Sequence, residues 1–185
     1  KQEGITEDEL RTIVEVSHEE GVIESEEKKM INNVFDFGDA VAKDVMVPRI
    51  DMAFVDVEST REELLEIFRE EKYTRYPVYE DTTDNVIGII NIKDIFLADG
   101  EEEFDLRKYL RQPYYTYEFK KVSELMLEMR KATSNIVIVL DEYGATAGLI
   151  TLEDMLEEIV GEIRDEYDED EEDLIRRIGP REYVV

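Results

Sequence analysis

Apolar residues in the first forty positions of the chain follow helical spacing in two stretches. Thr6 and Glu9 have the spacing of a capping box ahead of the first stretch, and a break near Gly21 separates it from the second. The apolar positions are Leu10, Ile13 and Val14 in the first stretch and Met30, Ile31, Val34 and Phe35 in the second. The remaining positions are largely acidic, so the pattern predicts a helical arm over residues 1–41 that packs on another part of the protein.

From about Ala42 the pattern changes to short apolar runs alternating with amphipathic stretches, and it occurs twice. The first copy contains MAFVDV, ELLEIFREEKYTRYPVY and NVIGIINIKDIF, and the second contains YYTYEF, ELMLEMRKATSNIVIVL and ATAGLITLEDML. Gly88 and Gly148 lie 60 positions apart, as do Asp94 and Asp154. Phe68 and Met129 lie 61 apart, which places one extra residue in a turn around residues 81–85 of the first copy. These offsets indicate an internal duplication.

Each copy is predicted to form a strand, a helix, two strands and a second helix. The runs VIGII and IVIVL are β-branched and apolar on both faces, as in buried strands. Thr60 and Glu63 form a capping box ahead of the apolar stripe of Leu64, Ile67 and Phe68. One copy alone would bury too little surface to be stable, so we expect two copies sharing a sheet face. The predicted fold class is α/β (α+β), with two β-α-β-β-α units related by a pseudo-two-fold axis.

The pattern divides the chain into four expected segments. The acidic helical arm covers 1–41, the first unit 42–102 and the second unit 103–164. Residues 165–185 are expected to form an acidic linker, DEYDEDEED, followed by LIRRIGPREYVV as the first strand of an incomplete domain. The opening KQEGITEDEL lacks the basic and apolar regions of a signal peptide and is expected to be an internal cut.

Composition excludes several classes of function. Lys and Arg total 22 against 49 Asp and Glu, a formal charge of −27 that repels nucleic acid. The absence of cysteine removes thiolate metal sites, and His18 is the one histidine, so we expect no protein-held metal. The uncharged stretch from Tyr143 to Leu152 is far shorter than the roughly 20 apolar residues of a spanning helix. These features fit a cytosolic setting without a membrane span.

Thr151 and Asp154 are the residues with the clearest candidate chemistry. They lie where a strand passes into a helix, with the spacing of the N-cap and the third helical residue. One interpretation is helix capping, in which Thr151 accepts a backbone N–H and Asp154 favours the positive helix end. The other is ligand binding, in which the carboxylate accepts two ribose hydroxyls while the threonine and nearby N–H groups face a phosphate. Both roles can hold together.

The repeat resembles the CBS domain, whose units end in a glycine, a short strand, a Ser or Thr, two residues and an Asp that opens a helix. Gly148, Thr151 and Asp154 match this pattern, and Gly88, Asn91 and Asp94 match it with Asn for the hydroxyl residue. A closer resemblance is to the CorC/HlyC and cyclin M family of magnesium and cobalt transport (hemolysin-like) proteins. It rests on the acidic arm and on the strings VMVPR at 45–49, RYPVYED at 75–81 and LDEYGATAGLITLEDMLEEIVGEIRDEYD at 140–168.

This resemblance implies an adenosine nucleotide, ATP or AMP, held between the two units. Arg75 and Lys93 are the expected phosphate contacts, with surface ion pairing as the alternative. The residues that carry the implied site are Asp51, Met52, Ala53, Thr74, Arg75, Lys93, Asn135, Leu149, Thr151 and Asp154. A weaker pseudo-symmetric site would use Asn91 and Asp94, with Tyr114 and Tyr115 in place of Met52 and Ala53. We expect one strong site, because Tyr115 is bulky and Asn91 departs from the pattern.

Charge also bears on the form of the ligand. A chain of −27 repels free ATP, whereas magnesium-bound ATP carries about half the anionic charge, so ATP is expected to bring Mg²⁺ with it. The acidic run from Asp165 to Asp173 lacks the glycine of an EF-hand turn and is interpreted as a solvated linker.

The expected function is a regulatory module at the cytoplasmic face of the cell membrane that gates a divalent-cation transport domain of the same full-length chain. A homodimer is expected, with Leu156, Ile159 and Val160 suited to the contact. The alternative is a structural dimerisation module without a ligand. Enzymatic activity is not expected, since the sequence has no nucleophile beside a base and no GxxxxGK[ST] motif. The transported ion and the choice between AMP and ATP stay open.

Overall fold

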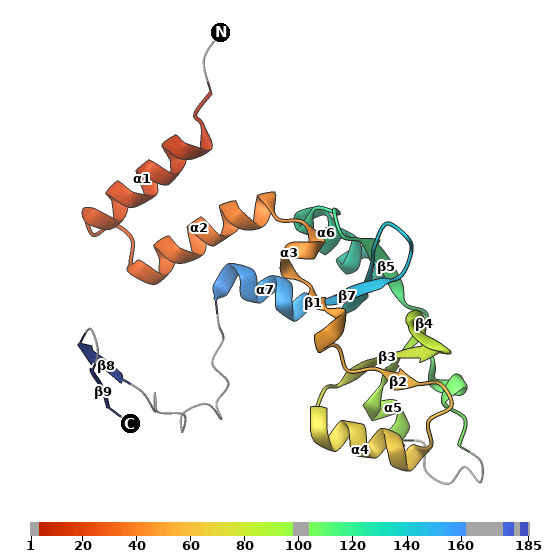
Figure 1. Ribbon diagram of the computed structural model, residues 1–185. Helices are drawn as coiled ribbons and strands as arrows, with labels where there is room; N and C mark the ends of the chain where they lie inside the picture. The colour runs from red at the N-terminus through yellow and green to blue at the C-terminus, as the bar shows by residue number, and fades with distance from the viewer. Residues whose placement is uncertain (1–3, 98–103, 162–175, 180–181, 185) are drawn as a thin grey trace.

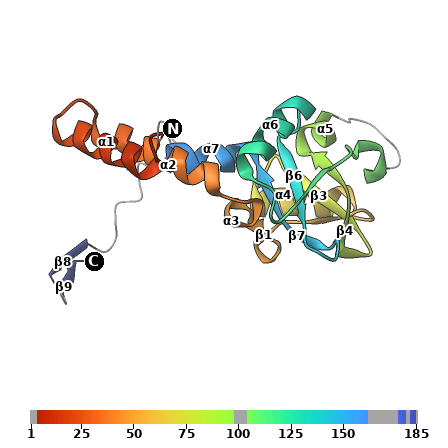
Figure 2. The same ribbon diagram turned by 90° about the horizontal axis from the view of Figure 1, so that it is seen from above.

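The structure is a computed structural model that describes residues 4–97, 104–161, 176–179 and 182–184. A helical arm extends from a body made of two α/β units, as Figure 1 shows and Figure 2 confirms from above. The mixed α/β architecture predicted from the duplication is therefore confirmed. No helix among the described residues combines the length and the apolar character needed to cross a bilayer.

The arm consists of the two predicted helices, α1 (Glu7–Glu19) and α2 (Ser25–Asp39). The capping box at the start of α1 is present, because the Glu9 N–H donates to Thr6 Oγ1 at 3.3 Å and the Thr6 N–H donates to Glu9 Oε2 at 2.8 Å. The break between the helices contains Gly21 with φ of +74°, a left-handed conformation that favours glycine.

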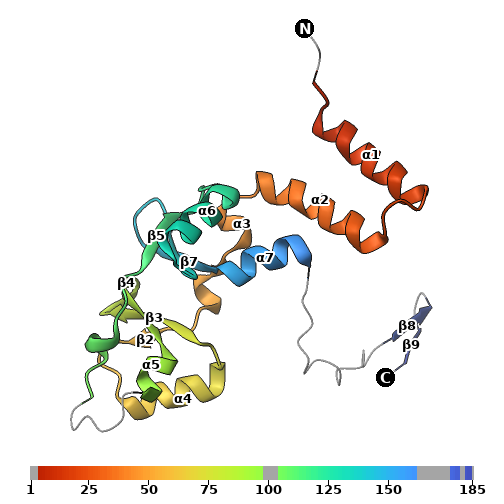
Figure 3. The same ribbon diagram turned by 180° about the vertical axis from the view of Figure 1, so that it is seen from behind.

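Ion pairs join the two arm helices to one another, and α2 joins the arm to the body. Arg11 Nη2 lies 2.8 Å from Asp36 Oδ1, and Lys28 Nζ lies 2.7 Å from Glu15 Oε1. At the body, α2 packs along α7 (Leu152–Val160), where the Asn33 amide donates to the Ile159 carbonyl oxygen at 3.1 Å. Figure 3 shows these two helices side by side from behind. The helix that begins at Thr151 is thus in direct contact with the arm.

Both units have the predicted order of elements. The first contains β2 (Val55–Asp56), α4 (Arg61–Glu71), β3 (Arg75–Glu80), β4 (Thr82–Asn91) and α5 (Ile92–Leu97). The second contains β5 (Tyr114–Tyr117), α6 (Val122–Ala132), β6 (Ile136–Leu140), β7 (Thr146–Thr151) and α7. In each unit the first strand pairs parallel with the second, and the second pairs antiparallel with the third. This shared pairing supports the duplication read from the sequence.

The segment that leads into each unit packs on the other unit, which the sequence pattern did not predict. The first such segment contains α3 (Ala42–Val45), β1 (Val47–Pro48) and the 3₁₀ turn η1 (Arg49–Asp51). Strand β1 joins the second unit's sheet, whose order is β1-β7-β6-β5, while the first unit's sheet is β2-β3-β4. The second segment contains η2 (Leu106–Tyr109), and its residue Arg111 bridges to Ile89 of β4.

Gly88 and Gly148 permit this exchange of segments. A Cβ atom on Gly148 would lie 2.5 Å from the Val47 carbonyl oxygen and 2.7 Å from Met46 Sδ. A Cβ atom on Gly88 would lie 2.7 Å from Leu110 Cδ2. The two glycines that repeat in the sequence therefore lie where the leading segment of the other unit passes closely.

Three apolar clusters form the core. One fills the second unit and includes Ala42 from the leading segment, and one fills the first unit and includes Leu106. The third lies between the units and contains Met52, Val86, Ile89, Ile136 and Ile138. The expectation of two copies that share a buried face agrees with this third cluster.

The C-terminal strand prediction is incomplete. Where one strand was expected, the backbone forms two, β8 (Arg176–Gly179) and β9 (Glu182–Val184), paired antiparallel. The acidic linker and the run from Asp165 to Asp173 lie outside the described residues.

Candidate functional site

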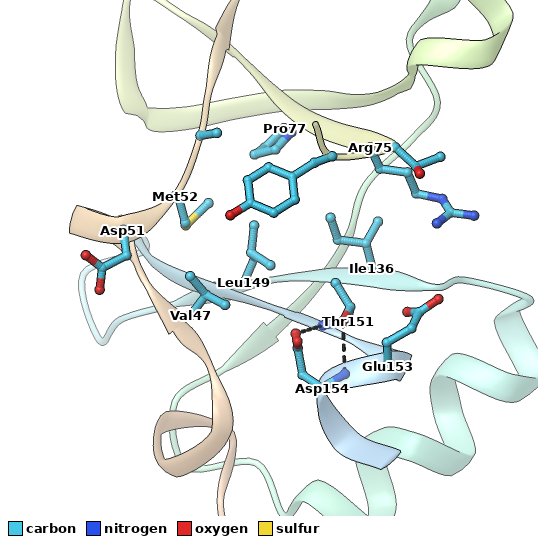
Figure 4. A pocket seen from close by; sticks show the side chains of 13 residues that line it. Val47, Asp51, Met52, Arg75, Pro77, Ile136, Leu149, Thr151, Glu153 and Asp154 are labelled. Carbon is cyan, nitrogen blue, oxygen red and sulfur yellow. Dashed lines mark hydrogen bonds between the residues drawn. The ribbon is translucent and has the colours of Figure 1, made fainter. Parts of the chain in front are cut away.

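A cavity of about 350 Å³ lies between the two units, beside their shared apolar cluster. Figure 4 shows it from close by. The first unit and its leading segment provide Val47, Asp51, Met52, Ala53, Tyr73, Thr74, Arg75 and Pro77, and the second unit provides Ile136, Leu149, Thr151, Glu153 and Asp154. Both units are thus needed to form the site.

The floor of the cavity is the start of α7. Thr151 Oγ1 accepts the Asp154 N–H at 3.1 Å, and Asp154 Oδ2 accepts the Thr151 N–H at 2.7 Å. These two bonds are a complete capping box, so the capping role of the pair is confirmed. The box also fixes the Asp154 side chain at the cavity, where its carboxylate has acceptor capacity beyond the single bond to Thr151.

One end of the cavity is apolar. Val47, Met52 and Leu149 lie together there, with Pro77 above them (Figure 4). Leu149 and Val47 are neighbours because β1 and β7 pair at these two residues. Strands β1, β7 and β3, together with Met52 after η1, thus present an apolar slot that suits a flat, uncharged group such as a purine.

The other end of the cavity is polar. Arg75, at the start of β3, and Glu153 of α7 lie towards this end, while Asp51 lies at the apolar end (Figure 4). The charged side chains around the cavity are therefore one guanidinium and three carboxylates, those of Asp51, Glu153 and Asp154. A polyphosphate at this end would face Arg75 but would also be repelled by Glu153 unless a cation accompanied it.

Most of the sequence-predicted residues line this cavity. They are Asp51, Met52, Ala53, Thr74, Arg75, Leu149, Thr151 and Asp154. Asn135 does not line it; its exposed side chain precedes Ile136, and its carbonyl accepts the Leu152 N–H at 3.0 Å. Lys93 does not line it either, because it lies on the first turn of α5 in the first unit. The equivalent turn of α7, which does line the cavity, carries Glu153 at the matching position. The repeat therefore places Lys93 at the pseudo-symmetric position.

Sequence reasoning missed Val47, Tyr73, Pro77, Ile136 and Glu153 among the lining residues. Glu153 could have been predicted from the 60-residue offset, because Glu153 is the counterpart of Lys93, for which contact with a phosphate was expected. Val47 had no such signal, because its position depends on the pairing of β1 with the other unit.

At the pseudo-symmetric position, the chain's own side chains bond to the residues expected to bind a ligand. Arg111 Nη2 lies 2.6 Å from Asp94 Oδ2, and Asn91 Oδ1 accepts the Lys93 N–H at 3.0 Å. The Tyr115 hydroxyl donates to the Val86 carbonyl oxygen at 2.6 Å, and burial raises the pKa of this phenol above its usual value. Asp94, Asn91 and Tyr115 are thus already bonded to other groups of the chain.

The strand register changes the expected correspondence between the two copies by one residue. Val55 of β2 lies opposite Val78, and Thr116 of β5 lies opposite Val139. Val78 and Val139 are 61 positions apart, so Thr116 corresponds to Val55 and Tyr115 corresponds to Phe54. Tyr115 therefore does not replace Ala53, as the sequence comparison had it, because those two residues lie 62 positions apart, whereas the first strands keep the 61-residue offset of the helices.

A family model for the CBS domain matches the chain twice, at residues 42–101 and 106–161. Among curated proteins, UPF0053 protein YugS of Bacillus subtilis is 42% identical over 182 residues, which cover 98% of this chain and 42% of that protein. The magnesium and cobalt efflux protein CorC of Pasteurella multocida is 34% identical over 180 residues, covering 96% of this chain and 60% of CorC. The chain thus spans about two fifths of the first of these relatives and three fifths of the second.

Solved structures show the same likeness. The CBS domain of a bacterial CNNM/CorC family Mg²⁺ transporter is 36% identical, with a TM-score of 0.77, covering 88% of this chain and 100% of that one. Its complex with ATP has a TM-score of 0.70 and covers 74% of this chain and 99% of that one. A CBS-domain pair with bound AMP from Klebsiella pneumoniae is 26% identical, with a TM-score of 0.59, covering 66% of this chain and 99% of that one. The chain belongs to the CBS domain family, as a tandem CBS pair of the type found in CNNM/CorC magnesium transporters.

Proposed function

We propose that this CBS pair binds an adenosine nucleotide between its two units and thereby gates a divalent-cation transport domain of the same full-length chain. The observation that carries the proposal is the cavity itself, in which Thr151 and Asp154 of one unit lie across from Asp51, Met52 and Ala53 beside the other. Related CBS domains with bound ATP and with bound AMP support the class of ligand.

The two ends of the cavity suggest how the nucleotide lies. The base would occupy the apolar slot formed by Val47, Met52 and Leu149, with the ribose hydroxyls on Asp154. The phosphates would then extend towards Arg75 and Thr74. Because Glu153 lies at this end, ATP would bind as its magnesium complex, with the ion brought by the phosphates.

The arm offers a route from the cavity to a transport domain. Helix α7 begins at the cavity with Thr151 and contacts α2 near its other end through Ile159 and Asn33. A nucleotide can shift the transport domain only by binding two arrangements of the units with different affinity. We propose that the arm, residues 1–41, communicates this difference at the cytoplasmic face of the membrane, without any catalytic step by the CBS pair.

Calorimetry on the purified chain tests nucleotide binding. Titrations with Mg-ATP, metal-free ATP and AMP are expected to show saturable binding of Mg-ATP or AMP, with metal-free ATP weakest. Heats at the level of dilution for all three, together with an unchanged melting temperature, would contradict the proposal. That result would favour the second candidate, a structural dimerisation module without a ligand, for which the exposed Leu156 and Val160 on α7 provide an apolar face.

The substitution Arg75→Ala distinguishes phosphate recognition from base recognition. Loss of a charge-assisted contact is expected to weaken Mg-ATP about tenfold or more, and to leave adenosine within about twofold. Calorimetry with both ligands gives the comparison. An equal loss for adenosine would mean that Arg75 supports the cavity wall instead of the phosphates.

A further inference from the structure

The chain crosses from one unit to the other directly beside the cavity. Strand β1 pairs with β7 of the second unit, η1 then turns the chain, and β2 joins the first unit's sheet. Met52 and Ala53, between η1 and β2, form one wall of the cavity. This wall therefore stands between two strands of only two residues each, which provide few ladder hydrogen bonds to hold it.

Within η1, one side chain is directed to the body of the protein. Ile50 is 91% exposed, and Asp51 is exposed at the cavity. Arg49, in contrast, forms an ion pair with Asp84 near the start of β4, in the β3–β4 hairpin, and its Nη2 donates to Thr83 Oγ1 at 2.9 Å. The Met52 N–H donates to the Arg49 carbonyl oxygen at 3.2 Å. Arg49 therefore closes the η1 turn through its backbone and attaches this turn to β4 through its side chain.

The hairpin residue Asp84 also contacts the second unit. The Thr146 hydroxyl, on β7, donates to the Asp84 carbonyl oxygen at 3.2 Å. Thr146 is only 3% exposed, so this contact lies at the buried junction of the two units. Asp84 thus contacts Arg49 of the leading segment through its carboxylate and Thr146 of the second unit through its backbone carbonyl.

We infer that Arg49 is a positioning residue for the nucleotide site, which it does not touch: its ion pair with Asp84 holds η1 so that Asp51, Met52 and Ala53 face Asp154. This inference rests on the proposed function and explains how its cavity wall is kept in place. The apparent affinity of a site scales with the fraction of molecules that have the binding-competent arrangement. Loss of the ion pair lowers that fraction without removing any group that contacts the ligand.

The test compares two arginine substitutions by calorimetry with Mg-ATP. Arg49→Ala is expected to weaken binding about fivefold, as the wall samples other positions. Arg107→Ala is the matched control, because Arg107 is similarly exposed, pairs at 2.8 Å with Glu58 and Glu80 of the first unit, and does not line the cavity. Both changes remove one positive charge, so the net charge is the same in the two variants. Arg107→Ala is expected to bind within about twofold of the unaltered chain.

Two further variants separate positioning from a loss of folding. Asp84→Asn keeps the shape of the side chain and removes the charge of the pair, and it is expected to weaken Mg-ATP binding in the same direction. Arg49→Asp combined with Asp84→Arg restores an ion pair and is expected to recover at least half of the lost affinity on a logarithmic scale. Binding within twofold of the unaltered chain for both Arg49→Ala and Asp84→Asn, or an equal loss in Arg107→Ala, would overturn the inference and leave the proposed function standing. Absence of binding by the unaltered chain would instead contradict the proposed function itself.

Discussion

Gly148→Ala is expected to lower the free energy of unfolding by about 3 kcal/mol, a large effect for a single added methyl group. The new Cβ would lie 2.5 Å from the Val47 carbonyl oxygen, a backbone atom that cannot move without separating β1 from β7. Equilibrium unfolding in urea, followed by circular dichroism, measures the change as a shift of the midpoint.

Gly88→Ala is the matched control, because it makes the same change at the equivalent position of the other unit. Its nearest contact, Leu110 Cδ2 at 2.7 Å, is at the end of a side chain that can change its rotamer, and the Leu110 Cβ atom, at 3.1 Å, must also shift by a few tenths of an ångström. A loss of about 1 kcal/mol is therefore expected. Equal losses at the two sites, or a Gly148→Ala variant as stable as the parent, would contradict the close approach of β1 to β7.

Asp154→Ala is expected to weaken Mg-ATP binding about 100-fold, because the carboxylate would lose its charged hydrogen bonds to two ribose hydroxyls. The variant also loses the capping bond from the Thr151 N–H, which is expected to lower the free energy of unfolding by about 1 kcal/mol. Calorimetry on the folded variant, at a temperature well below its melting point, measures the affinity separately from the stability.

Glu63→Ala controls for the capping part of this effect. Glu63 completes the capping box of α4, accepting the Thr60 N–H at 2.8 Å, and it does not line the cavity. The control is expected to lose a similar amount of stability and to bind Mg-ATP as the parent does. If Asp154→Ala also kept its affinity within threefold, Asp154 would be a capping residue alone.

Local patterns in the sequence predicted the parts of the fold that depend on nearby residues. The capping boxes at Thr6, Thr60 and Thr151 each involve partners three positions apart, and all three are present. The 60-residue offset predicted the two units because each copy carries its own hydrophobic period. Packing between the copies, by contrast, joins residues about 100 positions apart, such as Val47 and Leu149, and no local period encodes it.

The residues of the candidate site also fall into those that local sequence predicts and those that depend on packing between the copies. Thr151 and Asp154 were found because strand, cap and helix are adjacent in the sequence. Tyr73 and Pro77 were missed because only the folded crossing of the two units shows which part of β3 and its preceding turn faces the cavity. Lys93 was expected at the cavity but does not line it for a related reason, since it lies on the first turn of α5, whereas the cavity is formed at the first turn of α7.

The central claim is that an adenosine nucleotide binds between the two CBS units, and a crystal structure of the chain grown with Mg-ATP tests it most directly. We expect density for the base in the slot of Val47, Met52 and Leu149, for the ribose hydroxyls at Asp154 and for the phosphates beside Arg75. Crystals grown at saturating Mg-ATP whose cavity shows no nucleotide, or whose nucleotide lies only at Asp94, would contradict it.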